Sequence, residues 1–84
     1  MNLYQSQLDI AKSNIEIAFN NLIIAIERGE QAAAIECYEA IKAHFESLKA
    51  AFPQANIFQR ASVNRYEKKI MTKAQSALAK KGWA

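Results

Sequence analysis

Three residues divide the chain into stretches of helical length. Gly29, Pro53 and Gly82 are the only glycines and the only proline among its 84 residues. Because glycine and proline are the strongest interrupters of regular structure, their scarcity favours long helices over strands joined by tight turns. The stretches between them are rich in Ala, Glu, Lys, Gln and Leu, which favour the helix. The sequence therefore predicts an all-α protein, with helices over about 3–28, 31–51 and 57–80.

Local signals predict where the first two helices begin and end. Asn2 is a candidate N-cap, since its side chain can accept a hydrogen bond from a free backbone N–H. Gly29 can take the left-handed conformation that ends a helix. Pro53 disfavours helix at the preceding residue, so we expect the second helix to end there and a loop to follow over 53–56.

The third helix has a start signal of its own. Asn56, with Gln59 three residues later, resembles a capping box; a start at Ser62 is the alternative. Trp83 follows the last helix, and we expect it to dock on the core or on a partner. With such short connections, successive helices should pack antiparallel. We expect one domain, 1–84: a helical hairpin plus a third helix in a small, elongated antiparallel three-helix bundle.

The helix expected over 3–28 is apolar on two sides. One side is the inner stripe, formed by Tyr4, Leu8, Ala11, Ile15, Ala18, Phe19, Leu22, Ala25 and Ile26. The other is the isoleucine row, spaced by seven residues and formed by Leu3, Ile10, Ile17 and Ile24. A surface helix needs only one apolar stripe, so two stripes predict two contacts.

Two interpretations of the isoleucine row remain open at this point. In the first, the helix over 57–80 covers the row, which is then core. In the second, the row is a partner or oligomer seam. Asn14 and Asn21 lie beside it at the same seven-residue spacing, and they would then fix the register, as a buried Asn does in a coiled coil.

Charge is divided unevenly along the chain. Residues 1–51 hold four Lys and Arg against seven Asp and Glu, whereas residues 52–84 hold seven against Glu67 alone. Four basic side chains of the last helix project within about 80° of one another, with a fifth to one side. Together they form the basic face: Arg65, Lys68, Lys69, Lys73 and Lys80. Such a face could bind an anionic partner by neutralising phosphates; the alternative is an ordinary solvated surface.

Residues suited to catalysis or metal binding are sparse. Cys37 and His44 lie seven residues apart, so about 10.5 Å of helix separates them. They can neither share a zinc ion nor form a hydrogen-bonded catalytic pair. His44 is the only histidine, and no glycine-rich phosphate loop occurs. We expect no enzymatic activity, no cofactor and no metal site.

These features predict a non-enzymatic binding or regulatory protein that acts through protein–protein contacts, of the inhibitor, adaptor or co-chaperone type. Its expected partner is another protein or a second copy. The alternative is a nucleic-acid-binding accessory protein that uses the basic face. The lone Cys37, the absence of a run of 18 apolar residues and the absence of a secretory pattern favour a cytoplasmic protein without a membrane partner. No small-molecule substrate is expected.

Overall fold

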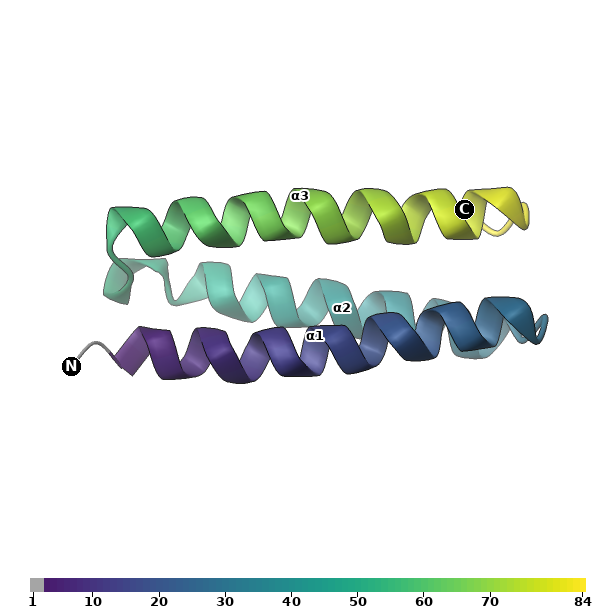
Figure 1. Ribbon diagram of the computed structural model, residues 1–84, viewed down its shortest axis with the longest axis horizontal. Helices are drawn as coiled ribbons and strands as arrows, with labels where there is room; N and C mark the ends of the chain where they lie inside the picture. Colours follow the sequence, from purple (N-terminus) through teal and green to yellow (C-terminus); the bar gives the residue numbers. More distant parts are fainter. Residues whose placement is uncertain (1–2) are drawn as a thin grey trace.

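The computed structural model describes residues 3–84, which fold into three long helices. α1 spans Leu3–Glu27, α2 spans Gln31–Ala50 and α3 spans Ile57–Lys80, with a 3-10 turn, η1, at Phe52–Gln54. α1 and α3 run in the same direction and α2 runs back between the two turns (Figure 1). The bundle measures 44 × 17 × 15 Å, so the predicted all-α, elongated three-helix bundle is confirmed.

The helix ends follow the local signals closely. α1 and α2 each end one residue before the predicted position, and α3 has the predicted bounds. Gly29 has a φ of +72°, the left-handed conformation that glycine adopts without a steric penalty. Asn2, the candidate N-cap of α1, lies outside the described residues.

The start of α3 is a complete capping box. The backbone N–H of Gln59 donates to the Asn56 side chain at 2.8 Å, and the backbone N–H of Asn56 donates to the Gln59 side chain at 3.0 Å. The alternative start at Ser62 is wrong, since that residue lies inside α3. The expected loop over 53–56 is wrong in its first half, because residues 53 and 54 belong to η1. Pro53 is part of η1, where a fixed φ and a missing N–H are tolerated at the start of a helical turn.

All three helices bury side chains along one common axis. The inner stripe of α1 packs against the buried apolar residues of α2 and α3. Between these two helices, Tyr66 packs edge-on against Phe45 with ring centroids 5.6 Å apart. Trp83 is half-buried against the same core, so of its two expected positions, on the core or on a partner, the structure shows the first. The fully buried aliphatic and aromatic residues from the three helices include Ile15, Leu22, Ile41, Phe45, Leu48 and Val63.

α3 does not cover the isoleucine row, so the core interpretation of that row is wrong. Leu3, Ile10, Ile17 and Ile24 are 77%, 64%, 59% and 42% exposed. The reason is geometric. Ile17 follows the buried Ile15 by two residues, which is about 200° around a helix. Because three helices converge on one axis, each contributes a single inner arc, and the opposite side of α1 is out of reach of α3.

Candidate functional site

The outer side of α1 is an apolar row set in uncharged surroundings. The row extends over 22 residues from Leu3 to Ile24, with about 32 Å between its two ends. Six exposed polar side chains flank it, and none carries a charge: Ser6, Gln7, Ser13, Asn14, Asn20 and Asn21. We call the row and these six residues the uncharged face. Since interface centres are depleted of charged residues, its composition is typical of a contact surface.

A shallow groove of about 400 Å³ borders the uncharged face, between α1 and α2. α1 contributes Ile17 with its neighbours Asn14, Ala18 and Asn21, and α2 contributes Glu36, Cys37, Ala40 and His44. The structure thus brings both predicted asparagines together with Ile17 at one groove. Two of the four α2 residues that line it, Cys37 and Ala40, have small side chains, which leaves room between Glu36 and His44 for an apolar side chain from another helix.

The one thiol that lines this groove belongs to Cys37. Burial, and secondarily the charge of Glu36, raise the pKa of the Cys37 thiol above its ordinary value. Cys37 therefore stays protonated at neutral pH, and a protonated thiol is a poor nucleophile. His44 lies two helical turns further along α2, as the sequence predicts.

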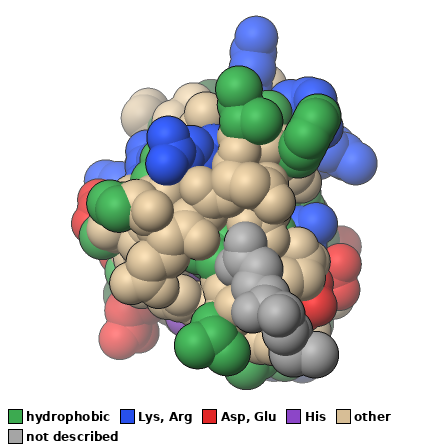
Figure 2. Space-filling view, turned by 90° about the vertical axis from the view of Figure 1, so that its left-hand side faces the viewer, with side chains coloured by type: hydrophobic (Ala, Val, Ile, Leu, Met, Phe, Trp, Pro, Cys, Tyr) green, Lys and Arg blue, Asp and Glu red, His purple; other side chains and the backbone are tan. Residues whose placement is uncertain are grey.

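The basic face lies on the outer side of α3. All five of its side chains are exposed, and among residues 3–84 none of the five forms an ion pair. The single acid of α3, Glu67, instead pairs with Lys49 of α2 at 3.0 Å. Seen end-on, Lys and Arg side chains gather over the part where α3 lies, whereas Asp and Glu side chains lie lower, at the sides (Figure 2).

Two large apolar residues at the start of α3 are also uncovered, and the pattern of apolar residues alone does not single them out. Ile57 and Phe58 are 74% and 82% exposed. Phe58 lies on one helical stripe with Ser62, Arg65 and Lys69, at steps of four, three and four residues. The signal available in the sequence was this spacing, which places an aromatic ring at the end of the basic face.

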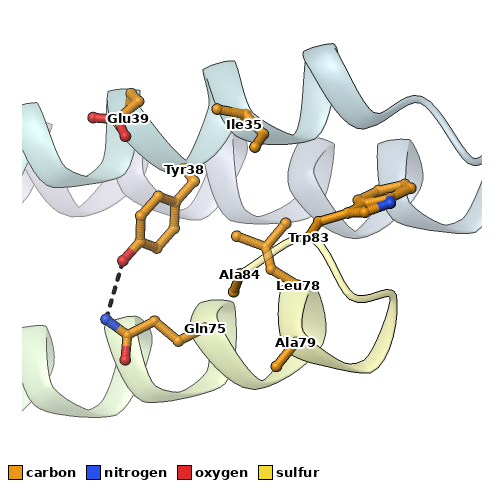
Figure 3. Close-up of a pocket in the computed structure, with 8 residues that line it drawn as sticks. All are labelled: Ile35, Tyr38, Glu39, Gln75, Leu78, Ala79, Trp83 and Ala84. Atoms are coloured by element: carbon orange, nitrogen blue, oxygen red, sulfur yellow. Dashed lines mark hydrogen bonds between the residues drawn. The ribbon is translucent and has the colours of Figure 1, made fainter.

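An apolar recess of about 590 Å³ lies between α2 and α3 at the opposite end of the bundle (Figure 3). Trp83 reaches from the C-terminal segment toward α2, and Gln75 donates a hydrogen bond to the Tyr38 hydroxyl at 3.0 Å. Glu39 is the one carboxylate side chain among the eight lining residues. The recess thus offers apolar contact but no acid–base pair.

Within the described residues, no group of three His, Cys, Asp or Glu side chains is arranged to hold a metal ion. No helix there is long and apolar enough to cross a bilayer. Comparison with protein-family models, with curated proteins and with solved structures gives no significant match. The surfaces of this chain itself are therefore the guide to its function.

Proposed function

We propose that this chain is a non-enzymatic binding protein that acts through protein–protein contact at the uncharged face of α1. One observation carries the proposal: Leu3, Ile10, Ile17 and Ile24 remain exposed although the bundle has a complete core without them. An exposed apolar patch with a polar rim is typical of an interaction site. The lone Cys37 and the cytoplasmic location expected from the sequence agree with such a role.

The energetics support a contact rather than an idle surface. Burying an isoleucine side chain fully is worth about 1.5–3 kcal/mol, and these four are uncovered by roughly half or more. A partner helix that covers the row would gain several kcal/mol without having to desolvate a charge of this face. The six amide and hydroxyl side chains of the rim would supply hydrogen bonds that orient the partner.

The test compares two isoleucine substitutions. The chain, immobilised as wild type, Ile17→Asp and Ile57→Asp, is offered to an extract of its native cell. We expect a specific partner to be retained by wild type and Ile57→Asp and lost with Ile17→Asp. The two variants share the same chemical change and the same added charge, so only position differs. Equal retention by all three would contradict the proposal.

The basic face favours a second function, the binding of nucleic acid. Five exposed cations without an ion pair among the described residues, together with the exposed ring of Phe58, are suited to phosphates and to an unpaired base. If the basic face neutralises four or five phosphates of duplex DNA, log affinity should fall with log salt at a slope of about −4.

A matched pair of variants tests this second candidate. Lys69→Glu with Lys73→Glu should abolish binding, whereas Arg28→Glu with Lys42→Glu, which changes the net charge equally, should leave most of it. A flat salt response, or equal losses in the two variants, would exclude specific use of the basic face.

A further inference from the structure

We infer that the uncharged face of α1 binds a second copy of this chain, with the two α1 helices antiparallel about a two-fold axis. The inference rests on the proposed function, because it names the protein that the row contacts. Three properties of the face support this occupant: its lack of charge, its spacing and its size.

The lack of charge favours a like partner. The chain carries a net charge of +3, but the charged residues between Leu3 and Ile24 lie on other sides of α1, Arg28 lies just beyond the row, and Glu36 of α2 borders the face at the groove. A partner attracted by charge would therefore dock elsewhere. A second copy presents the same uncharged face, so the two surfaces meet without electrostatic repulsion. Isologous contact of this kind is the commonest form of self-association.

The spacing makes the row complementary to itself. When two such helices are antiparallel and residue numbers at the same level add to 27, Leu3 lies opposite Ile24 and Ile10 lies opposite Ile17 of the second copy. Ser13 and Asn14 then flank the two-fold axis, where hydroxyl and amide groups can exchange hydrogen bonds. Every apolar residue of the row is paired with an apolar residue in this register.

Charge at the end of α1 selects the antiparallel arrangement. The backbone N–H of Arg28 donates to the carbonyl of Ile24 at 3.0 Å, so this residue continues the helical path just beyond the row. In a parallel pair the two Arg28 side chains would meet at one end and repel each other. In the antiparallel pair they lie at opposite ends.

The size of the face is sufficient if α2 takes part. A strip about 32 Å long and one helix wide, ~10 Å, covers roughly 320 Å². Including the bordering side of α2 doubles this to about 640 Å² per copy, which reaches the lower range of specific interfaces. α2 takes part through the groove beside Ile17. In the antiparallel register this groove lies level with Ile10 of the second copy, and the Ile10 side chain can enter it.

Sedimentation equilibrium tests the association itself. From about 5 µM to about 1 mM, the mean mass of the wild type should rise from 9.4 kDa toward twice that value. Ile17→Asp should raise the dimer dissociation constant at least about tenfold, and Ile57→Asp should not change it. Because the α1 part of the interface is uncharged and Glu36 is the one carboxylate that lines the groove, raising the salt from about 0.1 to about 1 M should leave the dimer intact.

Cysteine cross-linking tests the direction, in chains that also carry Cys37→Ser. Ser13→Cys lies next to the two-fold axis and should form an intermolecular disulfide. Asn21→Cys should not, because antiparallel packing separates the two copies of position 21 by about 22 Å. Cross-linking of both variants would indicate a parallel pair and overturn the register.

The outcomes separate this inference from the proposed function. A wild type that stays at 9.4 kDa throughout overturns the second copy as occupant. If that monomer still retains a partner that Ile17→Asp loses, the proposed function stands. If it retains none, or retains one equally well with Ile17→Asp, both ideas fail.

Discussion

The hydroxyl of Tyr4 donates a hydrogen bond of 2.9 Å to the backbone carbonyl of Leu48, across 44 residues of sequence. Leu48 belongs to the last turn of α2, whose carbonyls have no partner within the helix. A side chain near the start of α1 thus satisfies the end of α2, and both residues are almost completely buried. The bond closes the bundle at the end where η1 turns the chain toward α3.

Replacing Tyr4 with phenylalanine should therefore lower the free energy of unfolding by about 1–2 kcal/mol, because a buried carbonyl loses its partner while the ring still fills its place. Urea unfolding measures the change. Tyr38→Phe is the control, since its hydroxyl accepts from Gln75 at the surface, and it should cost clearly less. Equal losses in the two variants would show that the buried bond contributes little.

The same substitution at Tyr66 should have the opposite sign. Its hydroxyl is buried and lacks a hydrogen-bond partner among the described atoms, while its ring packs on Phe45 and lies 5.6 Å from the Lys12 ammonium. Tyr66→Phe keeps the ring and removes the unpaired polar group, so the free energy of unfolding should rise by up to about 1 kcal/mol. A loss as large as that of Tyr4→Phe would contradict this account.

Alkaline pH should widen the difference between Tyr66→Phe and the wild type. Burial, and secondarily the charge of Glu16, raise the pKa of Tyr66 in the folded chain. Above pH ~10 the unfolded chain gives up this proton while the folded chain keeps it, so wild-type stability falls as pH rises. Phenylalanine has no proton to lose. Paired urea curves between about pH 8 and 11 check this, and a constant difference between the two proteins would contradict it.

The two sides of α1 should respond very differently to substitution. Ile15 is fully buried, and Ile15→Ala should lower the free energy of unfolding by about 2–5 kcal/mol through a lost contact and a cavity. Ile10→Gln combined with Ile17→Gln should change it by less than about 0.5 kcal/mol, because both side chains are exposed within one chain.

Measurement at about 1 µM keeps self-association out of this comparison, since an associated state gains stability with concentration. A large loss in the double glutamine variant at that concentration would indicate that the isoleucine row contributes to the core of the single chain after all.

The helices themselves could be predicted because their signals are local. Gly29 ends the first hairpin through its own backbone freedom, and the reciprocal bonds of Asn56 and Gln59 involve residues only three apart. The inner stripe could also be predicted, since it repeats with the helical period and includes the bulky Tyr4 and Leu22, which the structure buries. Each of these features depends on a few neighbouring residues.

The position of α3 could not be predicted in the same way. Both sides of α1 are apolar enough to attract a third helix, and the choice depends on how all three inner arcs meet. Val63 and Leu78 of α3 are buried in the core that the inner stripe of α1 shares with α2. That arrangement leaves the isoleucine row outside, and no local pattern distinguishes it from core. Phe58 was missed for a related reason, because its spacing from Arg65 and Lys69 does not distinguish an exposed ring from a buried one.

An odd number of helices has a mechanical consequence. Because α1 and α3 run in the same direction, the start of α1 and the end of α3 lie at opposite ends of a bundle 44 Å long (Figure 1). Tension applied to these two points acts along the helix axes and loads every layer of the core at once in shear. A hairpin with both ends together would instead unzip one turn at a time. A three-helix bundle of this kind therefore resists tension between the start of α1 and the end of α3 more strongly than a two-helix hairpin pulled at its paired ends.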